Sequence, residues 1–411
     1  RSLLSHRSNR GSRVLKARAA ATVRIDLREY GEPVEARLGL DAAQALADVG
    51  IVDVRHVAGT DRWQVRPLGK VGAVRVGAVE VHVAPKVDID RIVFMVGYAT
   101  KGVSWRDDRV EVESAPELVE ALAEAFVRFA EKATRPGLLQ GYHVVEEPLQ
   151  VVRGRIREDE QIRRRFGLMV PVEVRYDDYT VDIVENRLLR AAVVRLLRLS
   201  QVSRKLRRRL AHLDLLLSDA ELVPRGVPIG EWHPSRLNAR YVDALRLAEV
   251  ILAGSSFEPS GAGLAVTGFI LDMPAVFEAF VCTALADALT EYGGRAVQQD
   301  RWHLDEASRV AMRPDLVWYE PSGTPGAVVD AKYKAEKYDG YPNADVYQLL
   351  AYCTALDLSE GHLVYAKGNE PAVAHQLRGS GVLVTCHALD LARETRALLD
   401  QVDDIAHAVT A

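Results

Sequence analysis

The sequence between residues 313 and 352 contains Arg313-Pro314-Asp315, then Val328-Val329-Asp330-Ala331-Lys332, then Gln348 and Tyr352. The second motif has the apolar run of a β-strand. Residues two apart in a strand point to the same side, so Asp330 and Lys332 share one face. An upstream strand over residues 310–319 can bring Asp315 alongside them. The sequence therefore predicts that two carboxylates and one ammonium group converge.

Carboxylates in this arrangement are typical of a Mg²⁺ site, because Mg²⁺ prefers oxygen ligands and keeps several waters for a phosphate substrate. Such a metal can activate water and stabilise the charge that develops on a phosphodiester in the transition state. A lysine adds a compact positive charge beside the phosphate or the attacking water. The motif predicts a nuclease with Mg²⁺ as its cofactor. A D-x-K motif alone is common, and at a strand end it is usually a set of solvated polar residues.

With their neighbours, these residues resemble the PD-(D/E)xK nuclease superfamily, with Pro314-Asp315 as the PD and Asp330-Ala331-Lys332 as the D-x-K. The resemblance implies that Asp315 and Asp330 bind the metal and that Lys332 is catalytic. Gln348 and Tyr352 look like the Q-x-x-x-Y motif of some branches, and with Arg313 they are expected to support the site or bind DNA. The predicted elements follow the superfamily order: a helix over 274–292, strands over 295–303, 310–319 and 327–332, a helix over 344–356 and a strand over 361–366.

Glu278 matches the glutamate that many members of this superfamily carry on the first helix. It lies one turn after a predicted helix start at Asp272-Met273-Pro274, where an acid also favours the helix dipole. Val281 and Cys282, three and four residues further on, are apolar. The glutamate is therefore expected to face inward, which calls for a partner such as a metal or Lys332. We favour a catalytic and metal-binding role over a purely local one.

The expected fold class is α/β (α+β overall). A chain of 411 residues exceeds one ordinary hydrophobic core, so we expect several domains. The C-terminal domain is expected to be restriction-endonuclease-like, with a mixed sheet flanked by helices. The Gly- and Ser-rich segment 253–268 is the predicted linker. The predicted division is a disordered basic tail over 1–21, a β-rich N-terminal α+β module for partner docking over 22–155, a helical basic middle region over 156–260 and the nuclease domain over 261–411.

Composition excludes several other classes of protein. The three cysteines lie far apart without a C-x-x-C motif, so we expect no structural zinc, disulfide framework or four-cysteine iron–sulfur cluster. No run of eighteen apolar residues and no signal peptide is found, which predicts a cytoplasmic protein without a membrane partner. The formal net charge is −4, yet residues 153–209 carry sixteen Arg or Lys and eight Asp or Glu. That stretch can bind phosphates or an acidic surface, or it can be a solvated helix face.

Over nearly the whole chain the sequence resembles the McrC family, the nuclease subunits of McrBC modified-cytosine restriction systems. Outside the nuclease domain the resemblance depends on Ala84-Pro85-Lys86-Val87, Arg153-Gly154-Arg155-Ile156 and Glu185-Asn186-Arg187-Leu188-Leu189. It implies a separate AAA+ partner, McrB, which binds GTP, forms a ring and usually recognises modified DNA. The McrC subunit docks into the ring with its N-terminal part, stimulates GTP hydrolysis and cuts the DNA. This chain has no G-x-x-x-x-G-K-[ST] loop, so GTP is expected on the partner.

The expected substrate is methylated double-stranded DNA, and two alternatives remain open. The chain could be a stand-alone PD-(D/E)xK defence or repair nuclease without a ring partner. It could also be a regulatory activator of an AAA+ motor with an idle nuclease site. The complete set Glu278, Asp315, Asp330 and Lys332 argues against an idle site.

Overall fold

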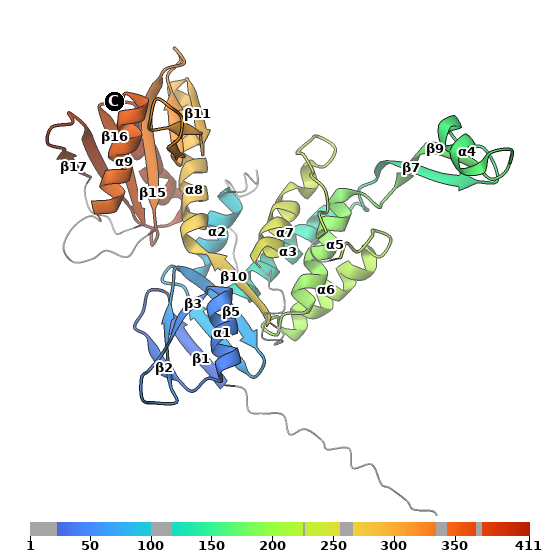
Figure 1. The fold of residues 1–411 in the computed structure, drawn as a ribbon, viewed down its shortest axis with the longest axis horizontal. Coiled ribbons are helices and arrows are strands. Elements are labelled where there is room, and N and C mark those ends of the chain that lie inside the picture. Colours follow the sequence, from blue (N-terminus) through green and yellow to red (C-terminus); the bar gives the residue numbers. More distant parts are fainter. Residues whose placement is uncertain (1–22, 100–116, 225–226, 255–265, 334–342, 367–371) are drawn as a thin grey trace, which may run out of the picture.

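The computed structural model describes residues 23–99, 117–224, 227–254, 266–333, 343–366 and 372–411. The predicted basic tail and most of the predicted linker lie outside these residues. Figure 1 shows the described parts: a β-rich N-terminal module, a central group of helices, a long arm, and a C-terminal domain built on a sheet. The predicted α+β class is confirmed, and the predicted domain boundaries stay predictions.

The N-terminal module contains two small sheets and one helix. One sheet has the strand order β1-β6-β5-β10, and the other has the order β2-β4-β3. Alternating apolar residues explain these strands, because in β1 Ile25 and Leu27 are buried while their neighbours are exposed. The elements are β1 (Val23–Arg28), β2 (Val34–Ala36), α1 (Leu40–Val49), β3 (Val52–His56), β4 (Trp63–Pro67), β5 (Lys70–Val76) and β6 (Val79–Ala84).

Strand β10 (Val266–Asp272) belongs to the N-terminal sheet, although the predicted boundary at residue 261 assigns it to the nuclease domain. It pairs antiparallel with β5, from Val266 opposite Val76 to Asp272 opposite Lys70. Val266 and Ile270 are buried in the core of the N-terminal module, and Phe269 and Leu271 in the core of the central helices, which a strand in a free linker could not achieve. The chain therefore returns to its first module immediately before the C-terminal domain begins.

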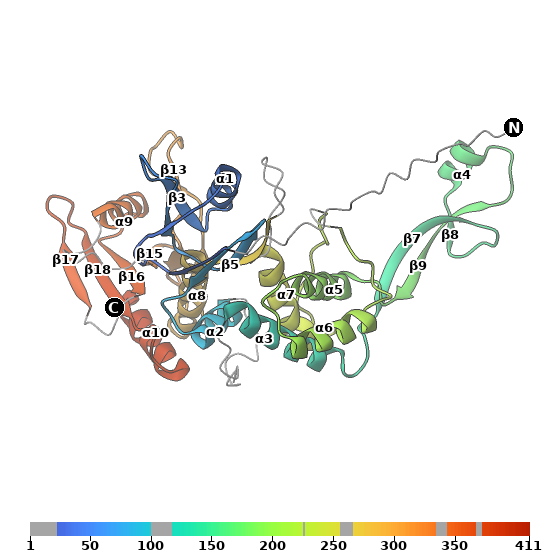
Figure 2. The same cartoon turned by 90° about the horizontal axis from the view of Figure 1, so that it is seen from below.

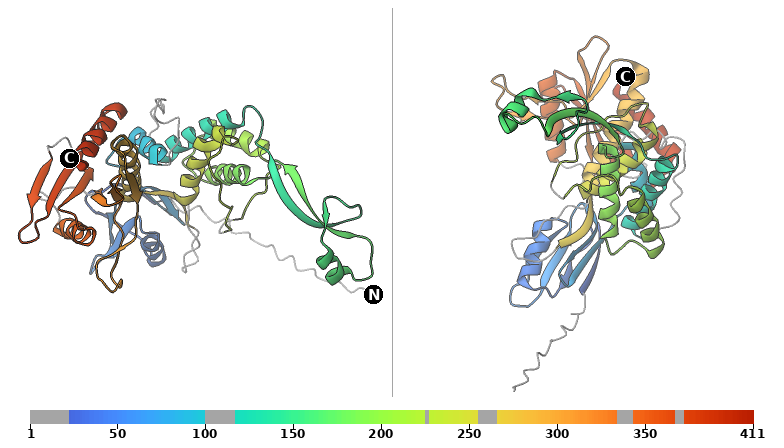
Figure 3. Two further views of the ribbon diagram at one scale, coloured as in Figure 1. Left: turned by 90° about the horizontal axis from the view of Figure 1, so that it is seen from above. Right: turned by 90° about the vertical axis from the view of Figure 1, so that its right-hand side faces the viewer.

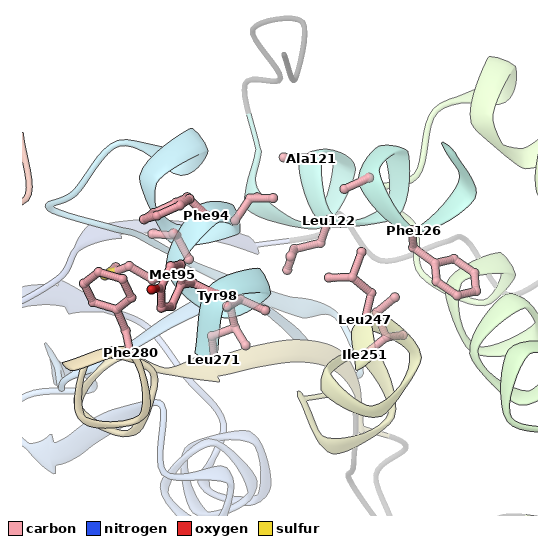
Figure 4. Close-up of a cluster of buried hydrophobic side chains, with 14 of the residues drawn as sticks. Phe94, Met95, Tyr98, Ala121, Leu122, Phe126, Leu247, Ile251, Leu271 and Phe280 are labelled. Atoms are coloured by element: carbon pink, nitrogen blue, oxygen red, sulfur yellow. The ribbon is translucent and has the colours of Figure 1, made fainter. Parts of the chain in front are cut away.

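The central helices share one hydrophobic core with the first helix of the C-terminal domain. Figure 4 shows Phe94 and Tyr98 beside Phe280, and Leu122 beside Leu247. Because one core joins these segments, burial of apolar surface fixes them to one another. The helices are α2 (Ile89–Ala99), α3 (Leu118–Thr134), α5 (Val184–Leu197), α6 (Arg204–Leu216), the short η2 (Ala239–Tyr241) and α7 (Val242–Gly254).

A β-arm projects from the central helices. It consists of the antiparallel strands β7 (Gly141–Leu149) and β9 (Val172–Thr180), the short β8 (Arg155–Ile156) and the helix α4 (Glu158–Arg165) at the tip. Figures 2 and 3 show that the arm extends well beyond the rest of the molecule. The sequence did not predict that β7 and β9 pair into one protruding unit.

The C-terminal domain is a mixed sheet with the strand order β11-β14-β15-β16-β18-β17. β15, β16 and β18 run parallel, and the outer pairs are antiparallel. The strands are β11 (Arg295–Gln298), β14 (Leu316–Tyr319), β15 (Pro325–Lys332), β16 (Glu360–Ala366), β17 (Val373–Gln376) and β18 (Leu383–Leu389), and the helices are α8 (Met273–Ala288), η3 (Leu289–Tyr292), α9 (Asn343–Leu356) and α10 (Thr395–Val409).

The two faces of this sheet are covered by different helices. Val329 and Ala331 of β15 lie in the core cluster that contains α8 and α10, whereas Val328 lies in the cluster that contains α9. Successive strand residues alternate between faces, so Asp330 and Lys332 share the α9 face with Val328. This alternation decides which helix can reach the predicted catalytic residues.

Helix α8 begins where the sequence predicted. The carboxylate of Asp272 accepts a hydrogen bond from Ala275 N at 3.2 Å, and Pro274 occupies the first turn. The segment Met273–Tyr292 is long and apolar enough to cross a bilayer by composition, but half of it is buried within the protein. It packs against α2, α10 and β15, and a buried core helix passes the same test.

Two predicted strands are interrupted. The strand predicted over 295–303 divides into β11 and β12 (Trp302–His303), and the one predicted over 310–319 divides into β13 (Ala311–Met312) and β14. Gln299 has a left-handed backbone with φ of 53°, and Pro314 has no N–H for a strand ladder. β12 and β13 pair with each other as a separate ribbon.

Candidate active site

Asp315 and Asp330 lie on neighbouring strands. β14 pairs antiparallel with β15 and Leu316 lies opposite Val329, so Asp315, one residue earlier, is beside Asp330. The two residues are 8% and 1% exposed. The structure thus brings together the two aspartates that the sequence predicted to converge.

Lys332 reaches the same place from the end of β15. Its Nζ lies 2.5 Å from Oδ2 of Asp330 and donates a hydrogen bond to Oε1 of Gln348 at 3.0 Å. Asp315 is held separately, because the backbone N–H of Ala331 donates to its Oδ2 at 2.9 Å. Two carboxylates and an ammonium group therefore form one compact cluster.

Burial controls the protonation of this cluster. It raises the pKa of Asp330 to about 7, the carboxylate of Asp315 adds to the rise, and Lys332 opposes it. Burial also raises the pKa of Asp315, against the effect of the hydrogen bond from Ala331 N. For Lys332 burial is the largest single influence and disfavours the ammonium form, but the charge and hydrogen bond of Asp330 together with the charges of Asp315 and Asp345 outweigh it and raise the pKa. Shifts of this kind are common at catalytic sites.

The residues present fit a hard divalent cation. Both carboxylate oxygens of Asp330 are buried without an aligned hydrogen bond among the described residues, although Oδ2 is close to Lys332 Nζ. Buried unpaired oxygens are costly, and a cation would satisfy them. In the described part of the chain no three or more His, Cys, Asp or Glu side chains form a metal-binding group. Two carboxylates suffice for Mg²⁺, whose other ligands are commonly waters and substrate phosphates.

Glu278 lies beside this pair without joining it as a ligand group. It is half-buried on α8, which packs on the sheet face opposite α9. Gln299 Nε2 donates to Oε1 of Glu278 and, at 3.2 Å, to Oδ1 of Asp315. Burial raises the pKa of Glu278, and the charge of Asp330 raises it further. The inward orientation predicted for Glu278 is thus found in part, with a glutamine as its hydrogen-bond partner.

Gln299 is a site residue that the sequence did not indicate. Its left-handed backbone directs the chain out of β11, and its N–H donates to the carbonyl of Asp315 at 3.0 Å. Arg313 Nε donates to the carbonyl of Gln299 at 3.1 Å, so this arginine fixes the backbone around Asp315. A glutamine after a strand has no distinctive sequence pattern, which is why it escaped prediction.

Gln348 and Tyr352 lie on α9, one turn apart and on the face that meets β15. Gln348 Nε2 donates to the hydroxyl of Tyr352 at 2.7 Å, and that hydroxyl contacts the carbonyl of Arg313 at 3.4 Å. A hydrogen-bonded chain therefore runs from Lys332 through Gln348 and Tyr352 to the backbone beside Asp315. This series of hydrogen bonds holds the ammonium group of Lys332 in place.

The basic stretch over residues 153–209 is partly a structural feature. Arg209 forms ion pairs with Glu124 at 2.5 Å and Glu131 at 2.8 Å, and Arg207 donates to the carbonyls of Leu197 and Val202. Two of the arginines in the run 204–209 thus hold α6 in place. These two arginines make contacts within the protein, a role that neither alternative left open by the sequence describes.

The raised pKa of Asp330 predicts a pH-dependent stability that needs no substrate. The folded protein binds a proton on the Asp330 carboxyl more tightly than the unfolded chain does. Protonation of Asp330 therefore stabilises the folded protein fully below about pH 4, and this stabilisation is lost as the pH rises through about 7. Asp330→Asn should therefore stabilise the metal-free protein at about pH 8 by ~1 kcal/mol or more. Thermal unfolding in a chelator would measure this, and the gain should shrink toward about pH 4. Equal unfolding temperatures of Asp330→Asn and the parent protein at every pH would contradict the raised pKa of Asp330.

The fold and the site define a class. A mixed sheet flanked by helices, with paired aspartates and a lysine where β14 adjoins β15, is a restriction-endonuclease-like domain of the PD-(D/E)xK type. The model of the family described as McrBC 5-methylcytosine restriction system component matches residues 65–366. This match covers more than half of the chain, so the chain belongs to that family. No curated protein matches it in sequence.

Solved structures support the fold. A chain from the Thermococcus gammatolerans assembly of McrB AAA+ hexamers with bound McrC matches with a TM-score of 0.56 and 18% identity. The match covers 94% of this chain and 100% of that chain. A second structure, the T. gammatolerans McrBC complex, matches 66% of this chain and 90% of that chain at 19% identity, with a TM-score of 0.39 that is too low to bear on the fold.

Proposed function

We propose that this chain is the DNA-cutting subunit of a two-component restriction complex, a Mg²⁺-dependent endonuclease that acts on methylated double-stranded DNA. The observation that supports the proposal most directly is the buried pair Asp315 and Asp330, with Lys332 Nζ 2.5 Å from Asp330. Oδ1 of Asp330 is buried without a partner among the described residues, which is unfavourable unless a bound cation satisfies it. Membership of the McrBC family supports DNA as the substrate.

Each residue of the cluster has a role that follows from its contacts. Asp315 and Asp330 would hold the metal, which supplies a polarised water and stabilises charge on the phosphate. Ala331 N–H fixes the orientation of Asp315. Lys332, held by Asp330 and Gln348, would neutralise charge on the attacked phosphate. Glu278, with its raised pKa, would hold a proton near Asp315 or act on a water bound by the metal.

The proposed partner is an AAA+ GTPase, by analogy with the T. gammatolerans assembly of McrB AAA+ hexamers with bound McrC. GTP would bind to the partner, because this chain has no phosphate-binding loop sequence. We propose that the chain also stimulates hydrolysis of GTP by that partner.

The tip of the β-arm is the surface that we propose for docking. Phe166 and Met169 are 86% and 87% exposed there, and Ile162, Leu168 and Val170 are also exposed. Clustered exposed apolar side chains commonly mark protein–protein interfaces. Glu173 is buried in the arm, pairs with Arg165 at 3.0 Å and donates its N–H to Gln161 at 2.7 Å. These contacts hold α4 against β9, so the tip is an ordered surface.

A reconstituted cleavage assay tests the proposed function. The chain, its AAA+ partner, GTP, Mg²⁺ and a methylated duplex are expected to give double-strand cleavage that stops in a chelator. Omission of the partner should also stop cleavage. Cleavage by the chain alone would favour the stand-alone nuclease, and stimulation of GTP hydrolysis without cleavage would favour the regulatory activator. An unmethylated duplex is the matched control.

A further inference from the structure

A second group of charged and aromatic residues, separate from Asp315 and Asp330, lies around the residue that follows Lys332 in the chain. Tyr333 follows Lys332 in the chain and is 3% exposed. Around it lie Glu29, which is 4% exposed, and Lys86, which is half-buried. Both belong to the N-terminal module, and Lys86 lies in the Ala84-Pro85-Lys86-Val87 motif that the nuclease chemistry leaves unexplained. We call Glu29, Lys86 and Tyr333 the interdomain cluster.

The interdomain cluster is tightly connected. Oε2 of Glu29 accepts hydrogen bonds from the Tyr333 hydroxyl and from the backbone N–H of Lys86, each at 3.1 Å. Nζ of Lys86 lies 4.1 Å from the centre of the Tyr333 ring. A cation at this distance over an aromatic face is attracted to it, and burial strengthens the attraction. Tyr333 is therefore held both at its hydroxyl and at the face of its ring.

The cluster contacts both segments that carry the candidate catalytic residues. The backbone carbonyl of Tyr333 accepts a hydrogen bond from the Tyr30 hydroxyl at 3.2 Å, so the end of β15 is also fixed by its main chain. The Tyr333 ring lies 5.7 Å from the ring of Phe277, centre to centre. Phe277 precedes Glu278 on α8. The N-terminal module thus holds the chain one residue after Lys332, and Tyr333 in turn contacts the residue before Glu278.

Packing alone gives a poor account of charged residues at this position. Burial raises the pKa of Glu29 and lowers the pKa of Lys86, so both ions are destabilised by their surroundings. Oε1 of Glu29 is buried without a hydrogen bond among the described residues. Apolar residues of similar volume would join two modules at lower cost. A directional contact that fixes one geometry is the better explanation.

We propose that the interdomain cluster positions the catalytic strand: Glu29 and Lys86 of the N-terminal module hold Tyr333, and Tyr333 holds Lys332 in its active position. This inference rests on the proposed nuclease function. The three cluster members are positioning residues, because none of them touches the pair Asp315 and Asp330 among the contacts described above. A shift of the N-terminal module would move Lys332 through Tyr333. Displacement of a catalytic group by about 1 Å can lower a rate about 10²-fold.

Substitutions in the cluster test the proposal against a matched control. Tyr333→Phe removes the hydroxyl that bonds Glu29 and keeps the ring, and Lys86→Met removes the cation and keeps the length of the side chain. The control Tyr98→Phe removes another tyrosine–carboxylate hydrogen bond between α2 and α8, from the Tyr98 hydroxyl to Asp287 at 3.3 Å. Thermal unfolding of each variant reports whether it is folded.

Two measurements decide the outcome. In single-turnover cleavage, Tyr333→Phe and Lys86→Met should be slowed about tenfold or more at saturating DNA, with DNA affinity unchanged. Lys86→Arg, which keeps the cation, should recover most of the rate. Hydrogen exchange in residues 325–333 should become faster in Tyr333→Phe. The control Tyr98→Phe should match the parent protein in its cleavage rate and in the hydrogen exchange of residues 325–333.

Three results would overturn the proposal. They are unchanged exchange in Tyr333→Phe, equal effects of Tyr98→Phe and Tyr333→Phe, and unchanged cleavage in both cluster variants. Failure of the proposed function is a separate result, since it is failure of the parent protein to cut DNA at all. In that case the exchange measurement still decides whether Glu29 and Lys86 hold the end of β15.

Discussion

Replacement of Asp330 by asparagine is expected to lower DNA cleavage at least ~10³-fold in the presence of the AAA+ partner, GTP and Mg²⁺. Asparagine has nearly the same volume as aspartate, so the buried position near the end of β15 stays filled. It has no charge, so it can neither hold a divalent cation strongly nor attract Lys332, whose Nζ lies 2.5 Å away. The initial rate of cleavage of a methylated duplex measures the effect.

The variant Asp330→Asn also distinguishes the proposed cleavage of DNA from the proposed stimulation of GTP hydrolysis by the partner. Strand β15, which carries Asp330, and the β-arm lie at opposite ends of the molecule in Figure 1, so stimulation of GTP hydrolysis by the partner should be retained. The matched control is Glu360→Gln on the neighbouring strand β16, where the carboxylate accepts a hydrogen bond from Thr385 at 2.7 Å. The control should cut DNA as the parent does. Cleavage by Asp330→Asn at the parental rate would remove Asp330 from the catalytic set.

The sequence predicted the centre of the site because its determinants are local. In β15 the alternation of strand residues puts Asp330 and Lys332 on one face, and the spacing within α9 puts Gln348 and Tyr352 on one face. Contacts between these elements agree, since Lys332 donates to Gln348 at 3.0 Å. Patterns of period two and of period 3.6 can be recognised in a single sequence. The shared face within each pair therefore followed from the chain alone, whereas the contact between Lys332 and Gln348 depends on how α9 packs on β15.

The parts that escaped prediction depend on contacts between distant segments. Strand β10 pairs with β5, and nothing in the sequence Val266–Asp272 indicates which strand it pairs with. Gln299 reaches Glu278 and Asp315 because of a left-handed turn that an ordinary residue rarely adopts. Pairing of remote segments and single backbone conformations leave little trace in local composition.

The β-arm illustrates a different reason for a missed prediction. Apolar residues are normally assigned to the core, so Phe166 and Met169 gave no signal of a surface role in the sequence. The structure exposes them at 86% and 87% on a projecting tip. Large exposed apolar side chains are informative only when the fold is known, because exposure cannot be derived from residue type. The partner surface was consequently assigned to residues 22–155 as a whole, an assignment that remains a prediction.

The double substitution Phe166→Ser and Met169→Ser is expected to weaken binding of the AAA+ partner at least ~30-fold, because loss of an interface anchor typically costs ~2 kcal/mol or more. Stimulated GTP hydrolysis and GTP-dependent cleavage should fall with it, while the unfolding temperature should stay the same, since neither side chain is buried. Affinity can be measured by titration of the labelled chain with the partner. The control is Leu215→Ser with Leu237→Ser, which removes two exposed leucines outside the arm. Equal losses in both double variants, or parental affinity in the arm variant, would exclude the tip as the docking surface and favour the β-rich module over residues 23–84.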